Sequence, residues 1–132
     1  MGHDARLRAL ILVAALSGAG CARTTRAPLL GIGPFRPGDP TLYDDAIAAA
    51  RDAGHPAVRT DPERGLFAVR AASDPMRRTY FVVQCSRDGF LTITPQSPDI
   101  VRTGDSFTLS RELRDEYGEL VLALERSIPE TR

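Results

Sequence analysis

The chain of 132 residues contains no lysine: all 17 of its basic side chains are arginines, and 17 Asp and Glu side chains balance them. Proteins that bind nucleic acid normally carry an excess of basic charge, often with interleaved aromatic residues. Here the arginines are scattered among carboxylates, so no nucleic-acid partner is expected. The use of arginine alone is more typical of a GC-rich genome than of a phosphate-binding site.

Histidine and cysteine are also scarce. Beyond residue 20 the chain has one histidine, His55, and two cysteines, Cys21 and Cys85. A single histidine cannot build a zinc site unless carboxylates or Cys85 converge on it. Its position at the predicted end of a helix favours a capping role. We therefore predict no metal, no cofactor and no catalytic residue; a hydrolase would require His55 within hydrogen-bonding reach of Cys85 or a serine.

Apolar runs long enough to cross a bilayer are absent as well. The N-terminal run from Ala9 to Leu16 has eight residues, whereas a spanning helix needs about 20. Arg6 and Arg8 precede this run, and the small residues 17–20 follow it. A charged segment, a short apolar segment and a small-residue cleavage region together predict an export signal.

The residue directly after this signal is Cys21. In this arrangement the leader resembles that of bacterial lipoproteins, whose cysteine is acylated and becomes the new N-terminus. The resemblance implies a signal peptide over residues 1–20, a membrane anchor at Cys21 and a location in the cell envelope facing the periplasm. Ala22 after the cysteine, in place of Asp, implies the outer membrane. The alternative is an ordinary secretory signal cut after Ala19, which would leave Cys21 free to pair with Cys85.

Proline and glycine are concentrated in residues 22–38, which therefore cannot sustain a helix. We expect residues 21–38 to be the lipidated cysteine and a tether, and residues 39–132 to be a single domain. A flexible tether of this length would span roughly 20 to 25 Å. Four apolar residues within it favour packing along the domain: Leu29, Leu30, Ile32 and Phe35.

Two helices are predicted in this domain. Asp39 is the expected N-cap of the first, Pro40 its first helical residue and Gly54 its stop signal. Apolar residues then recur at spacings of three and four from Leu109 to Ile128, which predicts the second helix.

Four strands are predicted between the helices. Segments with alternating or β-branched residues, separated by turn residues, lie near 57–60, 66–72, 79–86 and 90–94. Asp88-Gly89 is typical of a two-residue hairpin turn. The predicted fold is an α+β two-layer sandwich, in which an antiparallel sheet of three to four strands carries both helices on one face.

The segment AVRTDPERGLFAVRA, residues 57–71, places an acidic turn ending in glycine between two of these strands. Asp61 and Gly65 occupy the turn positions. With the preceding helix, the segment resembles the small helix-and-sheet domains of outer-membrane assembly lipoproteins. The resemblance implies scaffold or adaptor work and no catalysis.

The sheet face opposite the helices is the predicted partner surface. Strand alternation assigns five residues to it: Leu66, Arg70, Tyr80, Val82 and Phe90. Such a partly apolar patch suits a partner strand or helix. Cys85 alternates with the apolar set and is predicted to be a small core residue.

Arg77 and Arg78 lie at a predicted hairpin tip, where they could meet anionic lipid headgroups or the carboxylates of a partner. From these features we favour a non-catalytic protein-interaction module anchored in the envelope. The alternative is a periplasm-facing protein that binds a small molecule or lipid in a cavity between the sheet and the helices.

Overall fold

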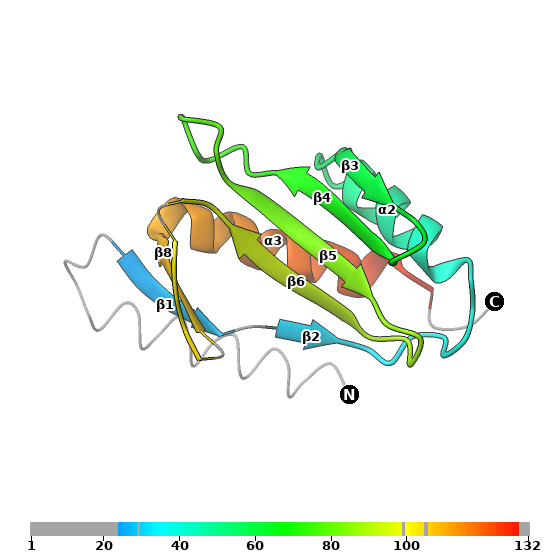
Figure 1. The fold of residues 1–132 in the computed structure, drawn as a ribbon. Helices are drawn as coiled ribbons and strands as arrows, with labels where there is room; N and C mark the ends of the chain where they lie inside the picture. Colours follow the sequence, from blue (N-terminus) through cyan, green and yellow to red (C-terminus); the bar gives the residue numbers. More distant parts are fainter. Residues whose placement is uncertain (1–23, 29, 99, 105, 130–132) are drawn as a thin grey trace.

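The computed structural model describes residues 24–28, 30–98, 100–104 and 106–129. They form an α+β fold with two antiparallel sheets and two helices (Figure 1). The predicted signal peptide and Cys21 lie outside the described residues.

The main sheet has five strands in the order β2-β6-β5-β4-β3, and all neighbouring pairs are antiparallel. Its strands are β2 (Leu30–Ile32), β3 (Ala57–Asp61), β4 (Leu66–Arg70), β5 (Tyr80–Cys85) and β6 (Leu91–Gln96). The four strands predicted from alternation are confirmed as β3 to β6. A hairpin turn is present at Asp88-Gly89, but it is not the predicted two-residue turn: the Ser86 amide donates to the Phe90 carbonyl at 2.8 Å across the three residues 87–89, and of these Gly89 alone has a positive φ, 88°.

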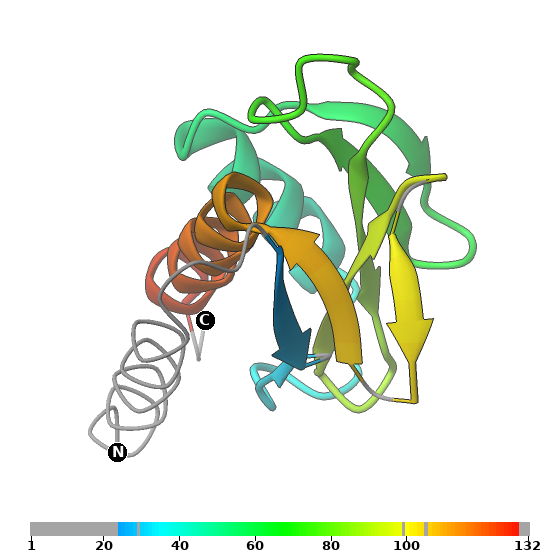
Figure 2. The ribbon, with the colours of Figure 1, turned by 90° about the vertical axis from the view of Figure 1, so that its left-hand side faces the viewer.

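A second sheet of three strands lies at one end of the main sheet. Its strands are β1 (Thr24–Pro28), β7 (Val101–Thr103) and β8 (Ser106–Ser110), and β8 is in the middle. Figure 2 shows them side by side, with β1 in blue, β8 in orange and β7 in yellow. The predicted single sheet of three to four strands was too small, because β2 adds a fifth strand to the main sheet and the second sheet was not predicted. β2 and β7 have only three residues each and are too short to show an alternating pattern.

The described part of residues 22–38 packs along the domain, as Ile32 and Phe35 led us to expect, and is therefore not a flexible tether. β1 pairs with β8 along its whole length, and β2 pairs with β6 so that Ile32 lies opposite Leu91. Ile32 is buried. Proline and glycine exclude a helix but not a short edge strand, so composition alone misjudged these residues.

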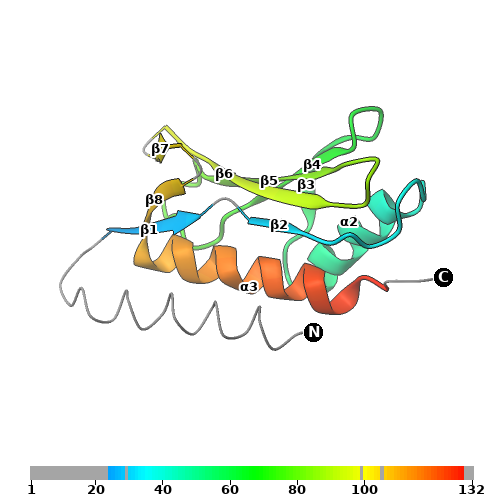
Figure 3. The same cartoon turned by 90° about the horizontal axis from the view of Figure 1, so that it is seen from below.

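Both helices lie on the same side of the main sheet, as predicted (Figure 3). They are α2 (Leu42–Asp52) and α3 (Arg111–Ser127). Neither of these two helices, which are those of the described residues, is long and apolar enough to cross a membrane.

The first helix begins later than predicted. The Asp39 carboxylate accepts hydrogen bonds from the amide and the hydroxyl of Thr41, at 2.8 and 2.7 Å, and so closes a turn before the helix. Pro40 belongs to this turn, and Thr41 is the N-cap. Gly54 does end the helix: its φ is 93° and its amide donates to the Arg51 carbonyl at 2.9 Å.

The second helix also begins later than predicted. Leu109 belongs to β8, where it is buried beside the equally buried Phe107 two residues earlier. Ser110 has an extended backbone and is the N-cap, and its hydroxyl accepts a hydrogen bond from the Leu113 amide at 3.2 Å. The apolar repeat therefore runs without a break from a strand into a helix.

The core lies between the main sheet and the helices. Phe67, Val69, Phe81 and Val83, which alternate with the predicted outer-face residues of β4 and β5, are all buried there. The helices complete it with alanines from α2 and larger apolar residues from α3: Ala46, Ala49, Ala50, Leu120, Val121 and Leu124. The small side chains of α2 allow the helix to lie close to the sheet.

Candidate functional site

The outer face of the main sheet carries four of the predicted partner residues. Arg70 lies directly opposite Tyr80 on the neighbouring strand, and Val82 and Leu66 follow on the same face. All four are partly exposed. The sheet therefore does bring this part of the predicted surface together.

Phe90 does not belong to this group. It is exposed, but it comes after the end of β5, whereas Tyr80 begins that strand. A strand rises about 3.3 Å per residue. Tyr80 and Phe90 are therefore separated by the full length of the six-residue strand β5. The alternation that placed Phe90 on the same face is interrupted by the turn at residues 87–89.

The loop between β4 and β5 holds Arg77 and Arg78 in exposed positions. Asp74 organises this loop, because its carboxylate accepts hydrogen bonds from the Thr79 hydroxyl at 2.7 Å and from the Met76 and Arg78 amides. The bond from Thr79 is the main reason that the pKa of Asp74 is lowered. Arg77 has a φ of 57°, a conformation uncommon for a residue with a side chain.

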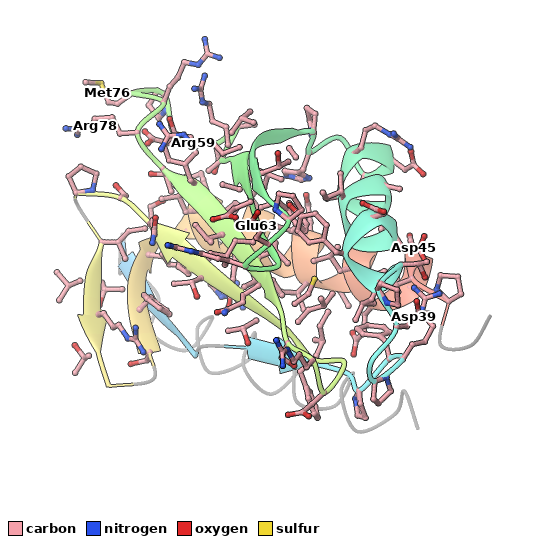
Figure 4. All side chains as sticks on the ribbon, turned by 45° about the vertical axis from the view of Figure 1, so that its right-hand side comes forward. Asp39, Asp45, Arg59, Glu63, Met76 and Arg78 are labelled. Atoms are coloured by element: carbon pink, nitrogen blue, oxygen red, sulfur yellow. The ribbon has the colours of Figure 1, made fainter. Side chains whose placement is uncertain are left out.

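A groove of about 550 Å³ lies where the outer face of the main sheet meets β7 and β8. Three exposed arginines from different elements line it: Arg59 of β3, Arg78 of the β4–β5 loop and Arg102 of β7. Figure 4 shows Arg59 and Arg78 on the same side of the molecule, whereas Asp39 and Asp45 lie at the other end. We call this feature the arginine groove.

Aromatic rings position the guanidinium groups. The guanidinium carbons of Arg59 and Arg70 lie 5.8 and 5.6 Å from the centre of the Tyr80 ring. That of Arg102 lies 5.6 Å from the ring centre of Phe107. Each contact is within the range of cation–π attraction, which is worth about 0.5–1 kcal/mol at an exposed site. Two arginines therefore share one tyrosine at the edge of the groove.

The charge of the groove is one-sided in the part of the chain that the structure describes. No Asp or Glu is among its lining residues there. Arg59 has no ion pair within the described ranges, and Arg70 donates only to the Tyr80 hydroxyl, at 3.4 Å, while its Nε has no hydrogen-bond partner. The groove is therefore suited to an anion or to the carboxylates of a partner.

His55 is engaged in a buried cluster on the other side of the sheet. Its Nε2 lies 3.1 Å from Oε2 of Glu116, and this carboxylate also accepts hydrogen bonds from the Ala72 amide at 2.7 Å and the Ser73 hydroxyl at 2.6 Å. Burial disfavours the charged carboxylate, but the bonds from Ser73, Ala72 and His55 outweigh it and lower the pKa of Glu116. The cluster joins α2, α3 and the β4–β5 loop.

Cys85 lies on the inner face of β5 and packs against the core, as predicted. Burial raises the pKa of its thiol to about 11, which suppresses the reactive thiolate. Within the described residues no hydrogen bond joins His55 to Cys85 or to a serine, because its bond goes to Glu116. His55 therefore makes a structural contact with Glu116, whereas a hydrolase would require its contact with Cys85 or a serine.

A smaller hollow of about 320 Å³ lies between the start of α2 and the turn joining β3 to β4. Tyr43, Cys85 and Arg87 line it together with Glu63 and Arg64. Tyr43 donates from its hydroxyl to the Leu66 carbonyl at 2.7 Å, which fixes the ring. This is the described hollow that comes nearest to the predicted cavity between sheet and helices, but both signs of charge line it.

Metal ligands do not converge in the described ranges: they contain no group of three His, Cys, Asp or Glu side chains placed to hold an ion. No family model, curated protein or solved structure matches the chain.

Sequence reasoning missed two members of the arginine groove. Arg59 follows an irregularity in the pairing of β3 with β4, which interrupts the alternation. Arg102 lies in a segment for which the sequence predicts no helix or strand, and only the return of β7 beside β8 brings it to the groove. The pairing of Arg70 with Tyr80, in contrast, follows directly from the hairpin pattern.

Proposed function

We propose that this chain is a lipid-anchored protein of the bacterial cell envelope whose α+β domain binds another envelope protein without catalysing a reaction. The observation that carries the proposal is the arginine groove, in which arginines of three elements lie around aromatic rings with no carboxylate in the described lining. The resemblance of the leader to bacterial lipoproteins supports the anchor at Cys21.

The pairing of β1 adds a geometric consequence to this proposal. Cys21 precedes Thr24 by three residues, and three extended residues span at most about 10 Å. Because β1 is paired with β8 from Thr24 onward, an acylated Cys21 would hold the domain against the membrane surface, not on a long tether. Ala22 supports the outer membrane as that surface.

The anchor is tested by the intact mass of the protein purified from its native membrane, beside the Cys21→Ala variant. We expect the wild-type chain to begin at Cys21 and to carry the mass of acyl chains that the variant lacks. An unacylated product with Cys21 oxidised to Cys85 would refute the anchor and support a secreted protein.

The interaction surface is tested by photo-crosslinking in cells. A photoreactive residue at Gln96, which lines the arginine groove, is compared with one at Glu119, which is exposed on α3. We expect one envelope protein to be crosslinked from position 96 and not from position 119. Equal capture from both positions, or none from position 96, would contradict the assignment of this surface.

A further inference from the structure

The two most exposed large apolar side chains of the described residues lie at one end of the molecule. They are Met76 of the β4–β5 loop, which is 66% exposed, and Val101 of β7, which is 62% exposed. Figure 1 shows the loop, and Figure 3 shows β7, at the left-hand end. Most of the apolar surface of these two side chains is therefore available to another apolar medium.

The register of the main sheet places the proposed anchor at this same end. Tyr80, where the β4–β5 loop ends, lies opposite Gln96, the last residue of β6. β2 runs antiparallel to β6, so Leu30 is its residue nearer to that end. β1 precedes β2 in the chain and starts still farther out, at Thr24 (Figure 1). The loop and the start of β1 therefore face the same way.

An acylated Cys21 would bring this end to the lipid headgroups. The three residues from Cys21 to Thr24 span at most about 10 Å. The headgroup layer on each side of a bilayer is about 5–7 Å thick, because a hydrocarbon core of about 30 Å lies within a total of about 40–45 Å. The start of β1 must then lie at or just outside the headgroups, and the loop lies at the same end.

Hydrogen bonds hold the β4–β5 loop so that Met76 projects from the domain. The Asp74 carboxylate accepts the Met76 amide at 2.9 Å and the Arg78 amide at 3.0 Å. Near the base of the loop, the Ser73 amide donates to the Glu116 carboxylate at 2.9 Å. Figure 4 shows Met76 at the outer tip. Because its backbone is already ordered, insertion of Met76 would not have to order the loop.

The charges at this end are of both signs. Arg77 is exposed beside Met76, and Arg111 and Glu112 are exposed at the start of α3. Net charge therefore does not select the occupant, and the apolar side chain of Met76 carries the argument. A guanidinium next to it suits the boundary between acyl chains and headgroups, because it can form two hydrogen bonds with one phosphate.

We propose that the β4–β5 loop is a second membrane contact, in which Met76 is buried at the headgroup–acyl boundary and Arg77 binds a lipid phosphate. The proposal rests on the proposed function, because acylation of Cys21 is what brings this end to the bilayer. The acyl chains supply the attachment. The loop supplies orientation, since a second point of contact fixes how the arginine groove is turned relative to the membrane.

Tryptophan fluorescence tests this contact, because the chain contains no tryptophan of its own. The acylated chain carrying Met76→Trp is reconstituted into phosphatidylcholine vesicles with or without bromine on the acyl chains. Phe90→Trp, exposed beyond the opposite end of β5, is the control. A docked interfacial side chain lies about 5–10 Å into the headgroup–acyl boundary, so bromine should quench the emission at least about threefold more at position 76 than at position 90.

A second substitution tests the arginine. Adding Arg77→Gln to Met76→Trp should lower the quenching, because the guanidinium that binds the phosphate is removed. Adding Arg87→Gln, an exposed arginine in the turn at the opposite end of the sheet, should leave the quenching unchanged. Equal effects of the two substitutions would remove Arg77 from the contact. Melting temperatures establish that each variant is folded.

Three results would overturn the loop contact and leave the anchor standing. An acylated chain that floats with the vesicles but is not quenched at position 76 would show that the loop does not touch lipid. Equal quenching at positions 76 and 90 would show that the domain has no fixed orientation. Absence of quenching, together with photo-crosslinking of position 76 to a protein in cells, would assign the loop to a protein partner. An intact mass without acyl chains at Cys21 would instead overturn both the anchor and this proposal.

Discussion

Nε2 of His55 lies 3.1 Å from Oε2 of Glu116 in a buried cluster that ties the end of α2 to α3. The same carboxylate accepts hydrogen bonds from the amides of Ala72 and Ser73 in the β4–β5 loop. One side chain therefore satisfies donors from two other parts of the fold.

Replacing Glu116 by alanine is expected to destabilise the protein by about 3 kcal/mol. The substitution leaves the amides of Ala72 and Ser73 and the ring of His55 without their acceptor, and unsatisfied buried donors are costly. Urea denaturation followed by circular dichroism measures the change. Glu119→Ala, on the exposed side of the same helix, is the control and should stay within about 0.5 kcal/mol. Equal effects of the two variants would show that the cluster contributes nothing.

The same carboxylate should make stability depend on acid. Its pKa is lower in the folded protein than the ordinary value of 4.5, so its contribution is fully present above that value and is lost as the pH falls through the folded pKa. Melting temperatures between pH 7 and pH 3 should therefore decline less in Glu116→Gln than in the wild type. A parallel decline in both proteins would assign the acid sensitivity to other carboxylates, such as Asp74.

Cys85 should react slowly with alkylating reagents in the folded state. With a thiol pKa of about 11, the thiolate fraction at pH 8 is about a hundredfold below that of a thiol with the ordinary pKa of 9.0. Mass spectrometry of peptides after timed iodoacetamide treatment measures labelling at this residue alone. Urea should restore the ordinary rate. Rapid labelling without urea would show that the thiol is not held in this environment.

Ile32 tests whether the segment expected to be a tether is part of the fold. Because its side chain is buried and β2 is paired with β6, Ile32→Ala should cost about 2–4 kcal/mol. Leu122→Ala removes a partly exposed apolar side chain from α3 and should cost less than about 1 kcal/mol. If Ile32→Ala left the free energy of unfolding unchanged, the segment would be a tether and not part of the fold.

The strands predicted correctly are those in which local pattern and tertiary burial agree. In β4 and β5, alternate residues such as Phe67 and Val83 are buried, and glycine turns such as that at Gly89 separate the strands. β2 and β7 form only because a longer strand is already present beside them, and a window of three residues cannot reveal that. Leu109 was assigned to the second helix because it lies four residues before Leu113, a helical spacing. In the structure it belongs to the end of β8, just before α3 begins.

The candidate site, too, was predictable only where its residues are brought together by local pairing. Arg70 and Tyr80 meet across one hairpin, which local sequence specifies. Arg59 and Arg102 reach the arginine groove from elements separated by several turns, so their convergence depends on the complete topology. Phe90 illustrates the opposite error, because it was predicted to begin a strand at residues 90–94, whereas β6 begins only at Leu91.

The pairing of Thr24 with Ser110 joins the first described strand to the last. The N-terminus of a chain leaves the ribosome or a translocation channel first. β1 is therefore exposed long before its partner β8 has emerged. Closing so long a loop is entropically costly and slow. Final assembly of the second sheet must therefore wait for nearly the whole chain, and until then β1 is an unpaired strand available to a chaperone.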